Sequence, residues 1–235
     1  MEIGVALDPD ADRAAAALVD AALDAAFARI AQVQAALSRF DACSEIGRFN
    51  DAPAGTAIAV GVDAAVVLAA AAELGEASDG LFDVSLGSGL SSWSCSAAIL
   101  YKHASGMRLD LGGIAKGHAV DVAVAVLQAN GIGAGWVNAG GDLRVFGALS
   151  LPIDLRDERS GGVRRFALLE DGAFATSRLS IPVAVRGDHT ANALRHVSVA
   201  SGLCLWADAL TKVVALSGDT GHPALAARSA RAWLH

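Results

Sequence analysis

Apolar side chains recur with a helical period in several parts of the chain. Between residues 11 and 37 they return every three or four positions, with Asp and Arg on the opposite face, which is the pattern of an amphipathic helix. Gly80 and Gly131 are residues suited to positive φ and follow two further helical stretches. Beyond the first helix we expect helices at 63–77, 115–130, 206–216 and 222–230, and a short capped turn of helix at 44–49.

Short apolar runs between turn residues predict strands, most of them in the second half of the chain. The ranges are 56–60, 107–111, 135–139, 142–146, 153–156, 164–169, 173–177, 181–185, 197–200 and 231–234. Residues 85–106 are rich in Ser and Gly and are expected to form a loop. The 235 residues match one large domain or two small ones. Because neither a repeat nor a linker demands two, we expect a single domain over 1–235.

Composition narrows the class of protein. Hydrophobic residues make up 54% of the chain, which is ample for a core. The net charge is −7 without a basic block, which argues against nucleic acid as a partner. Cys43, Cys95 and Cys204 are far apart and indicate neither a zinc site nor a disulfide framework.

The start, MEIGVALDPD, lacks the basic region and apolar run of a signal peptide. No apolar run reaches the roughly 18 residues of a membrane span. We therefore expect a soluble cytoplasmic protein, with the mature form of an exported protein as the alternative.

A glycine pair follows the strand predicted at 107–111. Asp110 lies in that strand, the pair at 112–113 permits close backbone approach, and Lys116 lies near the start of the next helix. Free N–H groups at a helix start favour anions, and a lysine there adds positive charge. Neither GxxxxGK[ST] nor GxGxxG is present. The stretch indicates either a phosphate site or a strand-to-helix turn with a surface lysine.

A second glycine pair, Gly140 and Gly141, can bring backbone amides against a ligand. Asn138 and Asp142 stand on either side of the pair and can face the same ligand. The alternative is a hairpin turn, in which glycine is equally common.

Three polar residues share one face of the helix predicted at 206–216, because Asp208, Thr211 and Lys212 are three and four residues apart. A carboxylate in the first turn can ligate a hard cation that also touches phosphates, as Mg²⁺ does. The alternative is a helix-terminal carboxylate with an i,i+4 ion pair.

His189 lies in a predicted loop and is a candidate acid or base, because histidine titrates near neutrality. The alternative is a solvated loop histidine. No Ser–His–Asp order and no HExxH motif indicates a hydrolase or a zinc protease.

Six segments, in this order, together resemble the ApbE family of FAD-dependent protein FMN transferases. They are SRFDACSEIGRFN at 38–50, SDGLFD at 78–83, DLGGIAKGHAVD at 110–121, NAGGD at 138–142, ATS at 175–177 and ADAL at 207–210. The resemblance covers most of the chain. It implies an α+β fold of mixed sheets with packed helices in one compact domain, which binds FAD and Mg²⁺ and has an acceptor flavoprotein as its partner.

The resemblance also assigns roles to residues. It implies FAD contacts at Leu81, Phe82, Asp83, Asp110, Lys116, Asn138, Gly140, Gly141, Asp142 and Ser177. The metal site it implies consists of the Gly113 carbonyl and Asp208, with Thr211 as a further candidate ligand. The candidate catalytic residues are His189, Lys116 and Asp208.

The chain departs from the family pattern in two places that bear on the site. Lys212 stands where family members usually carry Thr, four residues after the metal Asp. It can replace part of the metal's charge, weaken magnesium binding, or point away and leave the role to Thr211. The segment after His189 lacks the family's H-x-x-D-P-x-T-G pattern and is shortened.

The implied activity is transfer of FMN from FAD to a Ser or Thr of another flavoprotein, with release of AMP. Two alternatives remain: a FAD-binding protein that has lost transfer, and a pyrophosphatase that splits FAD into FMN and AMP.

Overall fold

The computed structural model describes residues 1–6, 13–156, 161–184 and 190–235. The larger of its two sheets has the order β1-β5-β6-β7-β8-β9, and every neighbouring pair is antiparallel. Its strands are β1 (Glu2–Val5), β5 (Gly135–Asn138), β6 (Asp142–Arg156), β7 (Val163–Ala184), β8 (Thr190–Ser201) and β9 (Arg231–Leu234). The smaller sheet, of order β2-β4-β3, contains β2 (Ala57–Ala59), β3 (Trp93–Ser96) and β4 (Ile99–Lys102).

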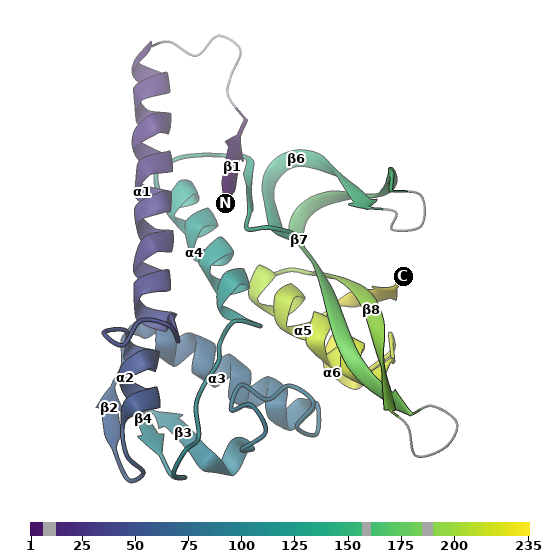
Figure 1. Ribbon diagram of the computed structural model, residues 1–235. Helices are drawn as coiled ribbons and strands as arrows, with labels where there is room; N and C mark the ends of the chain where they lie inside the picture. The colour runs from purple at the N-terminus through teal and green to yellow at the C-terminus, as the bar shows by residue number, and fades with distance from the viewer. Residues whose placement is uncertain (7–12, 157–160, 185–189) are drawn as a thin grey trace.

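Helices cover one face of the larger sheet (Figure 1). The helices are α1 (Arg13–Leu37), α2 (Glu45–Asp51), α3 (Val62–Ala77), α4 (Ala115–Ala129), α5 (Cys204–Ser217) and α6 (Pro223–Ala226), with a 3₁₀ turn, η1, at Leu90–Ser92. α5 packs on β7 and β8, α4 packs on β6 and α5, and the long α1 lies along α4. Antiparallel sheets with segregated helices make this an α+β fold, as predicted.

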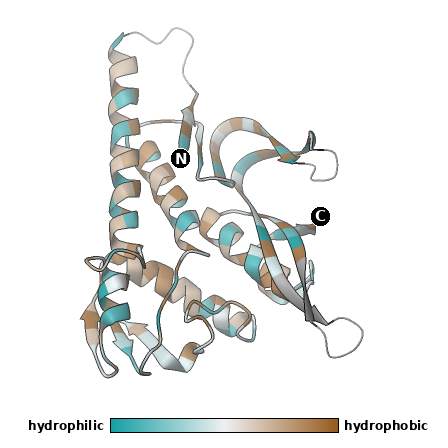
Figure 2. Ribbon diagram, viewed as in Figure 1, coloured by the Kyte–Doolittle hydropathy of each residue, from teal (hydrophilic) through white to brown (hydrophobic). Residues whose placement is uncertain are grey.

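Small apolar residues let the helices approach closely. Ala22 and Ala26 of α1 and Val120 and Ala123 of α4 are completely buried. Bands of hydrophobic residues recur along α1, α4 and α5 (Figure 2). No helix in the described part of the chain has the length and apolar character that a membrane crossing requires.

Most helix predictions are confirmed, and the start of α5 is corrected. α5 begins at Cys204 and not at Trp206, so Asp208 is the fifth residue of the helix and lies outside its first turn. The last helix is also shorter than predicted, because α6 ends at Ala226. The predicted cap at the end of α3 is confirmed, since Asp79 and Gly80 both have positive φ.

The prediction of a strand at 107–111 is wrong, although buried and more exposed side chains do alternate there. Met107, Leu109 and Leu111 are buried, as in a half-buried strand. Leu109, however, pairs with a side chain: its N–H donates to Asn50 Oδ1 at 2.7 Å, and its carbonyl accepts from Asn50 Nδ2 at 2.9 Å. The loop predicted at 85–106 is also wrong in part, since it contains η1 and the β3–β4 hairpin.

The strands predicted between 142 and 185 are longer than expected. β6 continues past residue 146 through a bulge in its pairing with β7, where the sequence suggests a turn. β7 continues through 178–180 in regular pairing with β8. Four residues of β6 oppose only Asp171 between the pairs Val145–Gly172 and Ser150–Glu170. Gly147 lies in this bulge with φ +72°, and a Cβ there would lie 2.0 Å from the Gly133 carbonyl oxygen.

Candidate active site

Four charged residues meet where α4, α5 and the start of β6 converge. We call Lys116, Asp142, Asp208 and Lys212 the charge cluster. Lys116 is the second residue of α4, Asp142 the first of β6, and the other two lie one turn apart on α5. The spacing on α5 is i,i+4, so Asp208 and Lys212 share one helix face. The structure therefore brings together predicted site residues from three separate segments.

Asp208 lies at the centre of the charge cluster, and its side chain is completely buried. Its Oδ2 accepts from Lys116 Nζ at 3.1 Å and from the Gly117 backbone N–H at 3.3 Å. Its Oδ1 is in direct contact with Lys212 Nζ. Each carboxylate oxygen thus has its own ammonium partner, which a buried charge requires to be stable.

Asp142 is the second buried carboxylate of the cluster. Its Oδ2 lies 2.8 Å from Lys116 Nζ, but no donor around it has hydrogen-bond geometry. Burial, and then the nearby charge of Asp208, raise the pKa of Asp142, and the Lys116 charge opposes this. The pKa of Lys116 is also raised. Burial lowers it, but the negative charges of Asp208 and Asp142 outweigh burial. Lys116 is therefore a cation at neutral pH, and half of its side chain is exposed to a ligand.

Lys212 points into the cluster. Its Nζ donates to the Asp208 carbonyl oxygen at 2.9 Å and to Ser177 Oγ at 3.2 Å. Its Cε lies 3.3 Å from the position of a Cβ on Gly113, so the ammonium stem passes directly over that glycine. Thr211 is fully buried beside it, and its hydroxyl lies 2.7 Å from the Asp208 carbonyl oxygen and 2.8 Å from Ser177 Oγ.

Gly117 permits the close contact of α4 with α5. A Cβ on Gly117 would lie 2.3 Å from the Cys204 carbonyl oxygen and 2.7 Å from Leu205 Cα. The two helix starts therefore touch through their backbones, which brings Lys116 within reach of Asp208.

Asp121 fixes the orientation of α5. Its carboxylate accepts the N–H groups of Cys204 and Leu205, each at 2.9 Å, and pairs with Arg144 Nη1 at 2.7 Å. These N–H groups belong to the first turn of α5 and lack partners within the helix. Asp121 thus caps α5 from another helix. In the sequence Asp121 stands in a segment that resembles the family, but its capping role is not predictable there, because a cap 83 residues away leaves no local signal.

We expect the substitution Asp121→Asn to lower the free energy of unfolding by about 1.5–2 kcal/mol, since hydrogen bonds to a charged group are worth about 1.5–3 kcal/mol each and an amide retains only part of them. Urea unfolding of the variant measures this. Asp20→Asn, at an exposed position on α1, is the control and should shift stability by less than about 0.5 kcal/mol. Equal stabilities for the two variants would contradict the cap.

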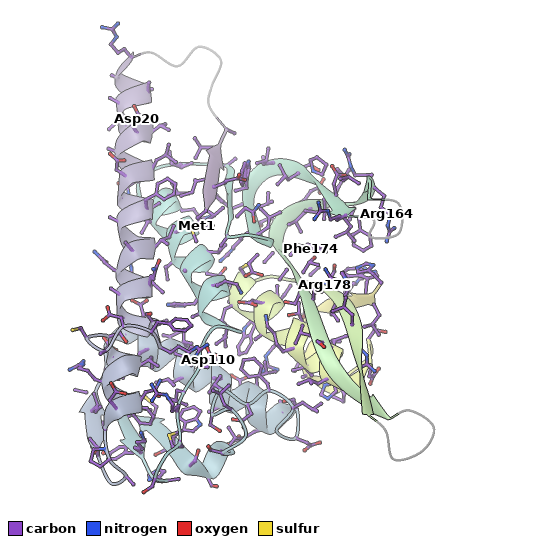
Figure 3. The ribbon with its side chains drawn as sticks, in the orientation of Figure 1. Met1, Asp20, Asp110, Arg164, Phe174 and Arg178 are labelled. Carbon is purple, nitrogen blue, oxygen red and sulfur yellow. The ribbon has the colours of Figure 1, made fainter. Side chains whose placement is uncertain are left out.

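A pocket of about 340 Å³ opens beside the charge cluster, between α1 and the start of α4. Lys116 and Asp110 line it together with Arg39, Phe40 and Leu111. Asp110 lies near the C-terminal end of α1 (Figure 3). Its carboxylate pairs with Arg39 Nε at 3.0 Å and accepts the Gly112 N–H at 2.9 Å. The pocket thus combines apolar walls with a few fixed polar groups, as small-molecule sites do.

The segment Leu81-Phe82-Asp83 reaches Gly113 through the Phe82 ring, on the side of the glycine where the Lys212 stem lies. The Phe82 ring lies 3.7 Å from the position of a Cβ on Gly113. Asp83 holds its own loop, because its carboxylate accepts from the N–H groups of Ser85 at 2.8 Å and Gly87 at 2.9 Å. Partial burial raises the pKa of Asp83, but these hydrogen bonds outweigh it and the net shift is downward.

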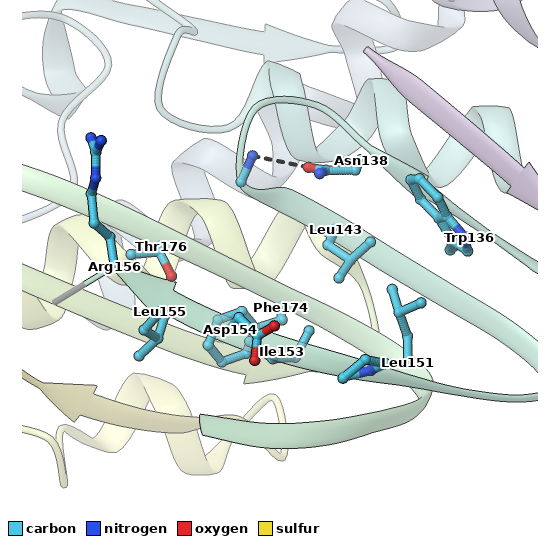
Figure 4. A pocket seen from close by; sticks show the side chains of 12 residues that line it. Trp136, Asn138, Leu143, Leu151, Ile153, Asp154, Leu155, Arg156, Phe174 and Thr176 are labelled. Atoms are coloured by element: carbon cyan, nitrogen blue, oxygen red, sulfur yellow. Dashed lines mark hydrogen bonds between the residues drawn. The ribbon is translucent and has the colours of Figure 1, made fainter. Parts of the chain in front are cut away.

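The turn between β5 and β6 separates Asn138 from Asp142. Asn138 pairs with Leu143 across the hairpin, so the two lie on one face of the sheet, and Asp142 lies on the other. Asn138 Oδ1 accepts the Gly141 N–H at 2.9 Å, and Gly140 and Gly141 both have positive φ. Asn138 and Gly141 line a second pocket, of about 360 Å³, on the face away from the helices (Figure 4). The two predicted ligand contacts on either side of this turn therefore face opposite sides of the sheet.

His189 lies outside the described residues. Its role as an acid or base stays a prediction.

The described side chains do not fit a magnesium ion. They contain no group of three or more His, Cys, Asp or Glu residues that could hold a metal. Both Asp208 oxygens already contact lysine ammonium groups, and the Thr211 hydroxyl is turned to the main chain and to Ser177. A divalent cation at Asp208 would lie beside two positive charges in a buried site, where like charges repel strongly.

The sequence profile of the ApbE family matches residues 2–99 and 96–179. No curated protein matches the chain significantly.

Several solved structures share the fold. The flavin transferase ApbE from Vibrio cholerae is 21% identical, with a TM-score of 0.77 over 99% of this chain and 88% of that one. The flavinyl transferase ApbE of Pseudomonas stutzeri, in its apo form, is 20% identical, with a TM-score of 0.72 over 92% and 80%. The ApbE protein from Thermotoga maritima is 20% identical, with a TM-score of 0.73 over 95% and 86%.

Proposed function

Because the chain belongs to the ApbE family, we propose that it is a flavin transferase that moves FMN from FAD to a Ser or Thr hydroxyl of an acceptor flavoprotein and releases AMP. We propose further that the whole chain, 1–235, acts as one such domain. The names of the solved relatives, two of which are flavin or flavinyl transferases, support the proposal.

The observation that carries the proposal is the position of Lys116. Its ammonium group is held between two buried carboxylates and is half exposed, at the mouth of a pocket of about 340 Å³. A pocket of this size can take part of a dinucleotide, with the pyrophosphate beside the ammonium. A fixed cation next to phosphate oxygens in a partly dehydrated site stabilises charge more effectively than water does.

The reaction requires one bond to form and one to break. The acceptor hydroxyl oxygen attacks the phosphorus of the FMN half, and the bond from that phosphorus to the bridging oxygen breaks. AMP leaves with the electron pair, and the hydroxyl proton passes to a base. Lys116 neutralises the charge that develops on the phosphate oxygens, while Asp142 and Asp208 keep it protonated. We retain His189 as the candidate base.

Incubation with FAD and a panel of purified flavoproteins in their flavin-free form, in which the target Ser or Thr hydroxyl is unmodified, tests the proposal. We expect protein-bound flavin that survives denaturation, together with one AMP released per flavin attached. Free FMN and AMP formed without an acceptor would instead indicate a pyrophosphatase. FAD binding without any AMP would indicate a binding protein that has lost transfer. Either result would overturn transfer as the function.

A further inference from the structure

We propose that the Lys212 ammonium supplies, from within the chain, the positive charge that the family resemblance assigns to Mg²⁺, so that this protein binds the FAD pyrophosphate without a divalent cation. The inference rests on the proposed function only in taking FAD as the ligand.

The first argument is position. The resemblance implies a metal held by the Asp208 carboxylate and the Gly113 backbone. Lys212 Nζ contacts Asp208 Oδ1 and also donates to the Asp208 carbonyl oxygen at 2.9 Å. Its stem lies 3.3 Å from the position of a Cβ on Gly113. The ammonium group therefore stands between the same two elements that the implied metal would bridge.

The second argument is the lack of replacement ligands. Two hydroxyls of the described residues bond to this part of α5, those of Thr211 and Ser177, and they lie 2.8 Å from each other. Ser177 Oγ also accepts from Lys212 Nζ at 3.2 Å. A metal ion would have to displace the ammonium group and break the hydrogen bond between these two hydroxyls. The Lys212 ammonium therefore already occupies the position where a metal would need its ligands.

The third argument is charge. The chain contains only three lysines among its 18 basic residues, and two of them contact Asp208. With two ammonium groups and two carboxylates, the charge cluster is formally neutral before any ligand binds. The two positive and two negative charges thus balance without a divalent ion. The i,i+4 spacing on α5 ties Lys212 to its carboxylate, so this cation cannot dissociate.

Manganese binding to the protein alone tests the inference without depending on activity. We expect a Mn²⁺ titration followed by electron paramagnetic resonance to show no tight site in the wild type. The substitution Lys212→Thr restores the family residue and should create one site per chain, at least 10-fold tighter than any binding by the wild type. Leu216→Thr, on the exposed surface of α5 one turn later, controls for threonine in this helix and should bind no Mn²⁺. A wild type that binds one Mn²⁺ as tightly as Lys212→Thr would overturn the inference.

FAD affinity provides the second measurement, by fluorescence quenching in EDTA and in MgCl₂. We expect the wild-type dissociation constant to agree within twofold between the two buffers. Lys212→Met, which keeps the unbranched stem up to Cε but not the charged Nζ, should bind FAD at least 10-fold more weakly in both. Lys212→Thr should lose affinity in EDTA and regain it in MgCl₂. A wild type that needs MgCl₂ to bind FAD, or fails to bind FAD in either buffer, would overturn the inference. Metal-free FAD binding without transfer would sustain it while the proposed function fails.

Discussion

Replacing Lys116 by Met is expected to lower the rate of AMP release from FAD by about 100- to 1000-fold, the usual cost of removing one fixed group that stabilises charge in the transition state. The ammonium group of Lys116 lies within 3.1 Å of both buried carboxylates, and half of its side chain is exposed toward the pocket. In the variant two buried carboxylates would share the single charge of Lys212, which would also make the site repel phosphate. Single-turnover kinetics with saturating FAD measure the chemical step.

The matched control for the loss of a cation is Arg165→Met, because Arg165 is exposed on β7 and pairs only with the exposed Asp154 in the described contacts. We expect it to retain full activity. Thermal unfolding of both variants shows whether a lower rate of AMP release comes from the missing ammonium group or from an unfolded protein. A Lys116→Met variant that is folded and within threefold of the wild-type rate would show that Lys116 does not act on the phosphates.

The substitution Gly117→Ala is expected to cost about 3 kcal/mol of stability, although alanine is normally better in a helix by about 1 kcal/mol. The added Cβ would lie 2.3 Å from the carbonyl oxygen of Cys204, and neither backbone can rotate away. α4 and α5 must therefore separate, which also breaks the contact between Lys116 and Asp208. We expect the thermal midpoint to fall by roughly 6–12 °C, since 1 kcal/mol corresponds to about 2–4 °C in a protein of this size.

Gly133→Ala is the control, because a Cβ there meets nothing within 4 Å and the backbone does not require positive φ. Its midpoint should stay within a few degrees of the wild type, while FAD binding is retained. If Gly117→Ala proves as stable as Gly133→Ala, the close approach of the two helices is not what holds the charge cluster together.

The sequence predicted the elements whose signals are local. Helical periodicity gave α1, α3 and α4 to within two residues of the bounds observed in the described part of the chain. The cap of α2 was also local, since Ser44 precedes the helix and accepts the Gly47 N–H at 2.8 Å. In the charge cluster, Lys116, Asp142 and Asp208 were recognised because each stands in a family segment.

What the sequence missed depends on contacts between distant segments. The side-chain amide of Asn50 bonds the N–H and the carbonyl of Leu109, as the backbone of a neighbouring strand would. The periodicity of the sequence does not reveal such a contact. The turn at 139–141 was recognised as a glycine turn, but the opposite directions of Asn138 and Asp142 follow only from the hairpin register. The direction of Lys212 was left open by the sequence, and the packing of α5 on β7 settles it by placing Ser177 beside the ammonium group.

The cap that Asp121 places on α5 also bears on the order in which the protein folds. It joins residues 83 positions apart, and the pair Lys116–Asp208 spans 92. Contacts of such separation form slowly, because the long intervening loop must close before they contribute. A chain that ends before Cys204 would leave Asp142 and Lys116 without α5, so we expect flavin binding to arise only after α5 has packed against α4.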